Sequence, residues 1–304
     1  MSDSKPLVSV LVTAYNRERF IADAIESVLS QTFRDFELLV VDDHSSDGTV
    51  QIARAFERHD RRVRVVVNAR NLGQFANRNH SAGLARGSFL KYHDSDDVMY
   101  PHCLETMVSM LQAYPDAAFG LSNGVAWPGG PCPMLLTPRM AYQREYLGQG
   151  LFMCGPSGAL FRAEAFRRLG GFEDVGVPSD YVFWVRACRQ VSVVLFPADL
   201  FWYREHSGQE LRSQRAEREY LQVTRIAWDA LGESDCPLSP DERDQARRNT
   251  LYALFKMVYA DCRGRQFVRA ARRLQESGVS VGEWIRWLRP SRRDAFAGSP
   301  AQCA

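Results

Sequence analysis

The run Asp94-Ser95-Asp96-Asp97 is the most chemically distinctive feature of the sequence. Three carboxylates within four residues repel one another unless a cation or hydrogen-bond donors offset their charge. Mg²⁺ or Mn²⁺ suits such a run, because hard divalent ions take oxygen ligands and bridge carboxylates to phosphates. The alternative is that Asp96 or Asp97 caps a helix that begins near Pro101. Both interpretations hold if different aspartates take the two roles.

The acidic run ends one of four apolar stretches that alternate with helical spacings, which predicts a parallel, doubly wound sheet. The expected strands are Val8 to Ala14, Phe36 to Val41, Val63 to Val67 and Phe89 to His93. The expected helices run from about Phe20 to Leu29, through Ile52 to Phe56, from Gln74 to Ala85, and from Pro101 to about Tyr114, with Ser45, Ser46 and Asp47 as N-cap candidates of the second.

In such sheets ligands bind outside the carboxyl ends of the strands. Those ends carry Tyr15, Asp43 and the pair Asp94/Asp96. Because neighbouring parallel strands end at the same edge, we expect these polar side chains to converge there.

The pattern changes in the second half of the chain. Residues 127–138 are rich in Pro and Gly and predict a loop, followed by a strand at Gly158 to Phe161, helices at Glu164 to Leu169 and Asp180 to Arg189, and a strand at Val191 to Phe196. Beyond about Gly208 only helical patterns remain. We therefore expect a catalytic domain over 1–208, divided into halves of about 7–125 and 126–208, and a helical region over 209–304.

Asp94-Ser95-Asp96 resembles the DxD motif of GT-A-fold glycosyltransferases, and the span from about Val8 to His206 resembles the inverting family 2. Other matching segments occur in order: Val12-Thr13-Ala14-Tyr15-Asn16, Ser30-Gln31-Thr32, Val41-Asp42-Asp43, Ser46-Asp47-Gly48-Thr49, Asn71-Leu72-Gly73, Arg78-Asn79, Gly170-Gly171-Phe172 and Tyr203-Arg204-Glu205-His206. Each segment alone is a weak signal, whereas their order and spacing together are specific.

The resemblance implies an inverting, metal-dependent transfer of a sugar from a nucleoside diphosphate, most simply UDP, to an acceptor hydroxyl. It places Thr13 and Tyr15 at the base and ribose, Asp43 at the base edge, and Arg78 at the base or diphosphate. The alternatives are a core aromatic for Tyr15, a helix cap for Asp43 and a solvated helix face for Arg78. Asp94 is implied at the ribose, and Asp96 at the metal, Mn²⁺ or Mg²⁺.

The resemblance also implies a catalytic base on the acceptor side, because inversion requires removal of a proton from the attacking hydroxyl. Asp180 matches that position, although Ser179 precedes it where many relatives have a glutamate. An N-cap role is the alternative for Asp180, and Glu173 and Asp174 are nearby alternative carboxylates. His206 matches a histidine that reaches the metal or diphosphate in several relatives; a lone histidine is more often structural.

Two other classes of protein compete with this hypothesis. A sugar-nucleotide pyrophosphorylase shares the nucleotide, the metal and an α/β sheet, but the stretch from Ala14 to Phe20 contains no glycine for a phosphate loop. A non-catalytic sugar-nucleotide scaffold has no need of a separate base such as Asp180.

Composition limits the partners and the compartment. The formal net charge of +2 gives no reason to expect nucleic-acid binding. The odd number of cysteines, 7, contains no CxxC pair, and no apolar run reaches the ~18 residues of a spanning helix. We therefore expect a cytoplasmic protein, with peripheral contact at the inner membrane face as an option.

The arginine-rich C-terminal helices have three interpretations. Trp284, Ile285, Trp287 and Leu288, interleaved with Arg286 and Arg289, suit core packing, an anionic membrane surface or a subunit contact. Core packing is the favoured interpretation. The sequence does not distinguish UDP from dTDP, and it identifies neither the sugar nor whether the acceptor is a carbohydrate or a lipid-linked molecule.

Overall fold

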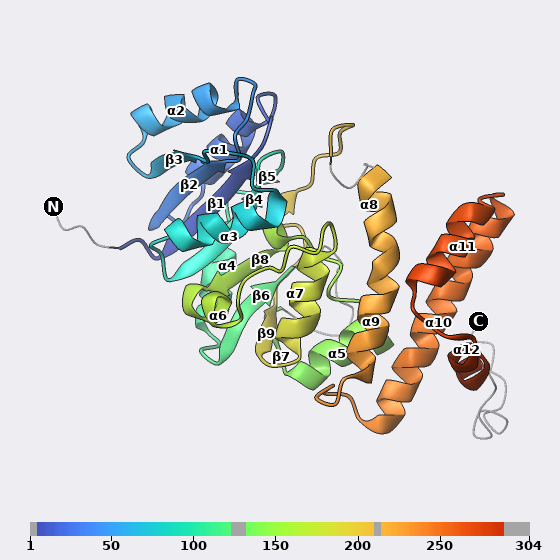
Figure 1. The fold of residues 1–304 in the computed structure, drawn as a ribbon. Coiled ribbons are helices and arrows are strands. Elements are labelled where there is room, and N and C mark those ends of the chain that lie inside the picture. The colour runs from blue at the N-terminus through green and yellow to red at the C-terminus, as the bar shows by residue number, and fades with distance from the viewer. Residues whose placement is uncertain (1–4, 123–131, 210–213, 289–304) are drawn as a thin grey trace, which may run out of the picture.

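The computed structural model describes residues 5–122, 132–209 and 214–288, and a single large sheet lies at its centre (Figure 1). Its eight strands follow the order β3-β2-β1-β4-β8-β6-β9-β7. Their bounds are β1 Val8–Ala14, β2 Phe36–Asp42, β3 Val63–Val67, β4 Phe89–Asp94, β6 Ala117–Leu121, β7 Met134–Leu136, β8 Ala159–Arg162 and β9 Ser192–Leu195. The four strands expected in the first third of the chain are confirmed.

Parallel pairing holds in the first half of the sheet and breaks in the second. β3, β2, β1 and β4 pair in parallel, as their alternation with helices predicts. β8 then runs antiparallel to both β4 and β6, β9 is parallel to β6, and β7 is antiparallel to β9. The sheet is therefore mixed, with its parallel half at the N-terminal end of the chain.

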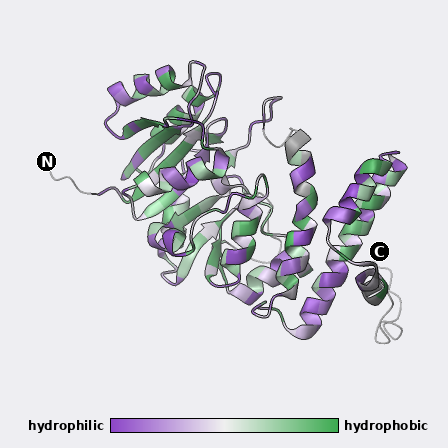
Figure 2. Ribbon diagram, in the orientation of Figure 1, coloured by the Kyte–Doolittle hydropathy of each residue, from purple (hydrophilic) through white to green (hydrophobic). Residues whose placement is uncertain are grey.

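Helices cover both faces of this sheet because its strands are apolar on both sides, as Figure 2 shows. One buried cluster joins the strands to α1 and α4, and the other joins them to α3, α6 and α7. The helices of this part are α1 Ile21–Leu29, α2 Thr49–His59, α3 Gln74–Leu84, α4 Cys103–Gln112, α5 Pro138–Leu147, α6 Ala163–Arg168 and α7 Ser179–Cys188.

Three details of the sequence-based prediction are wrong. Within the expected loop at 127–138, residues 127–131 lie outside the described part, but Met134–Leu136 forms β7 and Pro138 begins α5. Gly48, rather than Ser45, Ser46 or Asp47, is the N-cap of α2. A short antiparallel pair of β5 (Val98–Met99) and β10 (Phe201–Trp202), which the sequence analysis did not predict, brings the chain around Arg204 back to the acidic run.

From Gln214 onward the described chain forms only helices and the turns that connect them, as expected beyond about Gly208. Its elements are α8 Gln214–Glu219, a 3-10 turn Tyr220–Gln222, α9 Val223–Gly232, α10 Pro240–Arg263, α11 Phe267–Glu276 and α12 Val281–Leu288. α9 contacts α7, and α10 contacts α5 and α9 before its outer part pairs with α11 and α12 (Figure 1). None of the described helices is both long and apolar enough to cross a bilayer.

Side-chain contacts fix the start of α10 to α5. Ser239 caps α10 with a capping box to Glu242, and Glu242 also binds Arg139 at 2.8 Å and accepts a hydrogen bond from Gln143. The side chains of Trp287 and Leu288 lie outside the described part of the structure. The expectation of core packing holds in part for Trp284, which is partly buried beside Trp228 and the fully buried Leu251. It fails for Ile285, which is 50% exposed.

Candidate active site

The carboxyl edge of the parallel strands brings the expected donor-side residues together. β1 lies between β2 and β4, so that Thr13 is level with Val41 on one side and with Asp94 on the other. Tyr15 follows directly, with 48% of its surface exposed. Its ring is therefore open to solvent, which rules out the core-aromatic alternative.

Asp43 is buried and organises the segment that leads into α3. Its Oδ1 accepts hydrogen bonds from the Asn68 side chain and the Leu72 backbone, both at 2.8 Å, and its Oδ2 accepts one from the Gly73 backbone at 2.9 Å. These contacts replace the predicted helix cap, because Gly48 is the N-cap of α2 and the first N–H of this helix, that of Thr49, donates to Asp47 and not to Asp43. A carboxylate has about four acceptor positions, so one remains on Oδ2.

Arg78 is buried and ion-paired, not solvated. Its Nη2 donates to Asp94 Oδ1 at 2.5 Å, and its Nε and Nη1 have no hydrogen-bond partner in the described residues. Ser157 Oγ donates to the other oxygen of Asp94 at 2.8 Å. Burial alone would raise the pKa of Asp94, but the Arg78 charge and the Ser157 hydrogen bond outweigh it and hold that pKa below its usual value.

Asp96 is a mostly buried carboxylate that two basic side chains hold through one oxygen. Its Oδ2 accepts from Arg17 Nε at 3.2 Å and lies 2.9 Å from His206 Nε2. The Gly208 backbone N–H donates to His206 Nδ1, so a neutral His206 carries its proton on Nε2 and donates it to Asp96. The expected partnership of Asp96 and His206, from segments 110 residues apart, is therefore present as a hydrogen bond.

Neither Asp96 nor Asp97 caps a helix, because α4 begins at Cys103 with His102 as its N-cap. Asp97 is instead buried, and its Oδ1 accepts a hydrogen bond from the Arg204 backbone at 3.0 Å. Burial, reinforced by the neighbouring charge of Asp94, raises the pKa of Asp97 to about 8. Asp97 therefore ties the Arg204 segment to the acidic run.

The acidic run suits a divalent cation only if the phosphates of a substrate supply some of the ligands. Among the described residues no three histidine, cysteine or acidic side chains are grouped as metal ligands. A hard cation such as Mg²⁺ is commonly held by one or two protein carboxylates together with substrate phosphates. Both contacts of Asp96 use Oδ2, which leaves Oδ1 for such a cation, with His206 as a second ligand once it releases its proton.

Asp180 lies in the first turn of α7. Pro178 is the N-cap of this helix and no side chain caps it, so the N-cap alternative for Asp180 is wrong. Asp180 Oδ1 accepts a hydrogen bond from the Tyr181 backbone at 2.7 Å. Burial raises the pKa of Asp180 to about 6. The positive charge of Arg78 lowers this pKa, and the negative charge of Asp94 raises it. The acceptor-side and donor-side carboxylates thus interact electrostatically through space.

Four residues near these groups were missed from the sequence: Arg17, Lys91, Ser157 and Arg204. Lys91 is fully buried in β4, and its Nζ donates to the backbone oxygens of Tyr92 and Ser157. A lysine inside an otherwise apolar strand was a usable signal, because lysine is almost never fully buried unless it is paired. Arg17 gave no such signal, whereas Arg204 lies in the matching segment Tyr203-Arg204-Glu205-His206, from which no role was assigned to it.

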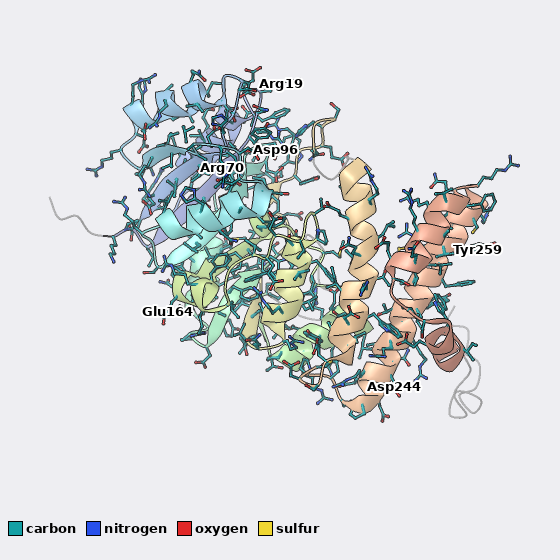
Figure 3. The ribbon with its side chains drawn as sticks, viewed as in Figure 1. Arg19, Arg70, Asp96, Glu164, Asp244 and Tyr259 are labelled. Atoms are coloured by element: carbon teal, nitrogen blue, oxygen red, sulfur yellow. The ribbon has the colours of Figure 1, made fainter. Side chains whose placement is uncertain are left out.

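A basic hollow of about 560 Å³ opens next to Asp96. Its lining includes Arg17, Arg19, Phe20, Arg204 and His206. Figure 3 shows Arg19 and Asp96 on the same side of the molecule, at the edge where the parallel strands end. The arrangement offers positive charge around one carboxylate, which suits a polyanion such as a diphosphate.

Comparisons with known proteins agree with this geometry. GalNAc(5)-diNAcBac-PP-undecaprenol β-1,3-glucosyltransferase from Campylobacter jejuni is 26% identical over 270 residues, which cover 83% of this chain and 82% of that protein. EpsE from Bacillus subtilis (strain 168) is 31% identical over 185 residues, and the aligned part spans 62% of its length and 57% of this chain.

Solved structures share the fold at low sequence identity. TarS 1–349 of S. aureus in complex with UDP-GlcNAc has a TM-score of 0.62 at 20% identity, over 92% of this chain and 78% of TarS 1–349. Mannosyltransferase PcManGT from Pyrobaculum calidifontis, in complex with GDP-Man and Mn²⁺, has a TM-score of 0.62 at 18% identity, over 93% and 79% of the two chains. The expected GT-A fold is confirmed.

The family model described as "Glycosyl transferase family 2" matches residues 9–170, which is more than half of the chain. The matched span contains β1 to β4, the acidic run and Arg78. This chain therefore belongs to glycosyl transferase family 2.

Proposed function

We propose that the chain is an inverting, metal-dependent glycosyltransferase that moves a sugar from a nucleoside diphosphate, most simply UDP, to an acceptor hydroxyl. The observation that carries this proposal is the partly exposed carboxyl of Asp180 in the first turn of α7, whose pKa is raised to about 6 by its largely desolvated surroundings and also responds to the charges of Arg78 and Asp94. A base with a pKa near the working pH is ionised in most molecules yet still accepts a proton readily.

On the donor side, the nucleotide is proposed to lie over Thr13 and Tyr15. The open ring face of Tyr15 suits stacking on a base. The remaining acceptor position on Asp43 Oδ2 suits the N3–H of uracil or thymine. Arg78 would hold a fixed positive charge beside Asp94, near the ribose and diphosphate.

Asp96 and His206 are the residues that would hold a divalent cation, with the diphosphate completing its ligands. Bound there, Mn²⁺ or Mg²⁺ supplies Lewis-acid stabilisation of the negative charge that develops on the leaving diphosphate. When the donor is absent, Arg17 offsets the charge of Asp96 and His206 donates a hydrogen bond to the same oxygen.

In the proposed reaction Asp180 removes the proton of the acceptor hydroxyl as that oxygen attacks the anomeric carbon. The new carbon–oxygen bond forms on the face opposite the nucleotide, and the bond to the diphosphate breaks with its electron pair. The products are the glycosylated acceptor and the nucleoside diphosphate, and the proton passes from Asp180 to solvent afterwards.

The acceptor is proposed to be a carbohydrate or a lipid-linked carbohydrate. The name of the C. jejuni relative specifies a diphosphoundecaprenol-linked substrate, as does that of WfgD from Escherichia coli, which is 39% identical over 105 residues, or 34% of this chain and 41% of WfgD. These names support the class of acceptor and leave the sugar open.

A donor screen without acceptor tests the proposal. The purified protein is incubated with Mn²⁺ and UDP-, dTDP- or GDP-sugars in turn, and slow hydrolysis is followed by the nucleoside diphosphate released. We expect UDP from one or more UDP-sugars. Binding without release from any donor would favour a non-catalytic scaffold, and formation of UTP when pyrophosphate is added would favour a pyrophosphorylase.

A further inference from the structure

The outer part of the C-terminal helices exposes large apolar side chains to solvent. Tyr252, Phe255 and Tyr259 follow one face of α10 at helical spacing and are 57%, 51% and 56% exposed. Phe267 and Val268, at the start of α11, are 64% and 69% exposed. Figure 3 shows Tyr259 across the molecule from Asp96, so this surface is separate from the catalytic edge.

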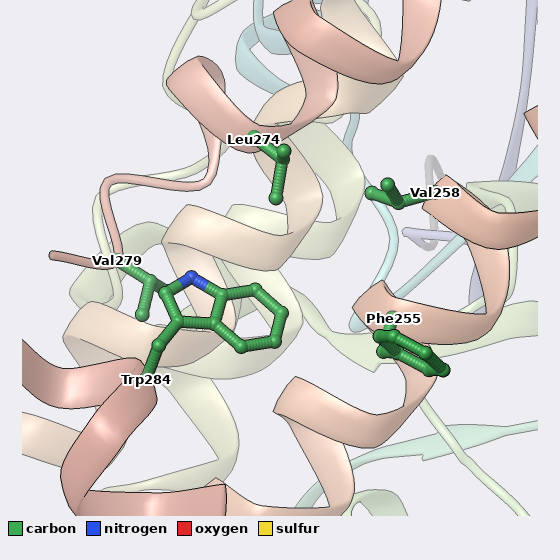
Figure 4. A pocket seen from close by; sticks show the side chains of 5 residues that line it. All are labelled: Phe255, Val258, Leu274, Val279 and Trp284. Carbon is green, nitrogen blue, oxygen red and sulfur yellow. The ribbon is translucent and has the colours of Figure 1, made fainter. Parts of the chain in front are cut away.

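An apolar hollow lies beside this surface. It is bounded by α10, α11 and α12, has a volume of about 520 Å³, and is lined by Phe255, Val258, Leu274, Val279 and Trp284 (Figure 4). Proteins that are otherwise well packed rarely expose so many large apolar side chains together. Such a surface usually marks an interaction site. The hollow also offers space for an acyl chain or an apolar side chain of a partner.

Positive charge surrounds the same helices. Residues 245–275 contain one acidic residue, Asp261, and eight basic ones, Arg247, Arg248, Lys256, Arg263, Arg265, Arg269, Arg272 and Arg273, whereas the whole chain carries only +2. The segment therefore has a formal charge of +7, and the rest of the chain −5. Asp261 is buried and paired with Arg269 and Arg273, while Lys256, Arg265 and Arg272 are exposed.

We infer that this surface, formed by α10, α11 and α12, docks onto an anionic lipid bilayer. Aromatic side chains beside arginine and lysine suit the boundary between headgroups and acyl chains. Residues 245–275 and the remaining chain carry opposite formal charges, +7 and −5. An anionic surface attracts the first and repels the second, which orients the molecule. Docking in this orientation leaves the catalytic edge away from the contact.

Two other occupants explain the surface less well. A second copy would bring two segments of +7 into contact, and like charges across an interface oppose association. A soluble polyanion would use the basic side chains, but it gives no role to Phe267, Val268 and the apolar hollow.

Vesicle flotation of the full chain tests the inference. We expect binding to vesicles of phosphatidylcholine mixed equally with phosphatidylglycerol, and little binding to phosphatidylcholine alone. Each basic side chain near an anionic surface contributes a factor of about five, so Lys256→Gln/Arg265→Gln/Arg272→Gln should weaken binding about 100-fold. Phe267→Ser/Val268→Ser should weaken it at least about tenfold, because two apolar side chains leave the bilayer.

Matched controls lie on the catalytic domain. Val67→Ser and Arg58→Gln/Arg61→Gln alter exposed residues of the same types and should leave flotation unchanged. Because the altered C-terminal residues are exposed and remote from Asp96, donor hydrolysis should equal that of the wild type and report intact folding.

Four results would overturn the inference. The first is no binding to anionic vesicles. The second is binding that neither C-terminal variant weakens. The third is an apolar variant that floats normally but loses self-association in sedimentation, which would assign the surface to a second copy. The fourth is retention of the protein on a soluble polyanion that depends only on the basic residues, which would assign the surface to that ligand. Each result is independent of the donor screen.

Discussion

Replacing Asp180 by asparagine should abolish transfer and stabilise the fold at the same time. Burial raises the pKa of Asp180 from 3.8 to about 6. A shift of about two units corresponds to roughly 3 kcal/mol by which the folded protein disfavours the ionised carboxyl at neutral pH. The asparagine side chain carries no charge, so the variant should be more stable than the wild type by up to about 3 kcal/mol, or roughly 5 °C in Tm.

The stability difference should depend on pH in one direction. The pKa of the folded state lies above that of the unfolded chain, so the cost of ionised Asp180 is complete above about pH 6 and disappears as the pH falls below 3.8. Melting curves of the two proteins should therefore differ most at pH 7 and converge near pH 4. In the wild type, kcat/KM should fall about tenfold per pH unit below about pH 6, because the protonated carboxyl is not a base.

Turnover measures the catalytic half of the prediction. Loss of a general base costs a factor of about 10² to 10⁴, whereas donor affinity in calorimetry should stay near that of the wild type. Asp174→Asn, an exposed neighbour, is the matched control and should keep full activity. Wild-type turnover by Asp180→Asn would refute the assignment of the base, and equal melting temperatures at pH 7 would refute the electrostatic reasoning.

Four further predictions concern the groups around this base. EDTA should remove transferase activity and Mn²⁺ or Mg²⁺ should restore it, and Asp96→Asn should not respond to added metal; full activity in chelator would contradict the proposed cation. Arg78→Gln leaves the partly buried Asp94 without its cation, which should lower the free energy of unfolding by about 1–3 kcal/mol in urea denaturation. Lys91→Met keeps the apolar packing of β4 but removes the donor to Ser157, so we expect turnover to fall with little change in far-UV circular dichroism. The pKa of Glu242 is held at about 2 by Arg139 and by the capping box, so Glu242→Gln should lower stability by about 1 kcal/mol above pH 4.5, and this difference should vanish as the pH falls towards 2.

The N-terminal half of the sheet was predictable because three of its strands, β1, β2 and β4, are buried on both faces along almost their whole length. All seven residues of β2 are buried, and such continuous apolar runs between amphipathic helices have few alternative structures. β7, β5 and β10 are only two or three residues long. Strands of that length have no periodicity of their own and exist because a neighbouring strand is in place.

The residues of the site divide in the same way. Asp43, Asp94 and Asp180 occupy strand ends or a helix start, where local pattern and family resemblance both apply. The partners of Asp96 cannot be found from local pattern, because Arg17 lies 79 residues before it and His206 110 residues after it. The β5–β10 pair and the hydrogen bonds from Arg204 to Asp96 and Asp97 bring the second of these into place, and a two-residue strand leaves almost no trace in the sequence.

Environment, rather than residue type, separates the roles of Asp94 and Asp180. Both carboxylates interact with Arg78, and burial by itself would raise both pKa values. Asp94 receives a direct ion pair and a serine hydrogen bond, so it stays ionised and suits a fixed negative group at the donor. Asp180 receives one backbone hydrogen bond from Tyr181 and only the through-space effect of the same guanidinium, so burial prevails and its pKa rises to about 6. Two aspartates that share one arginine are thereby set for different chemistry, which is how paired carboxyl groups divide acid–base work in other enzymes.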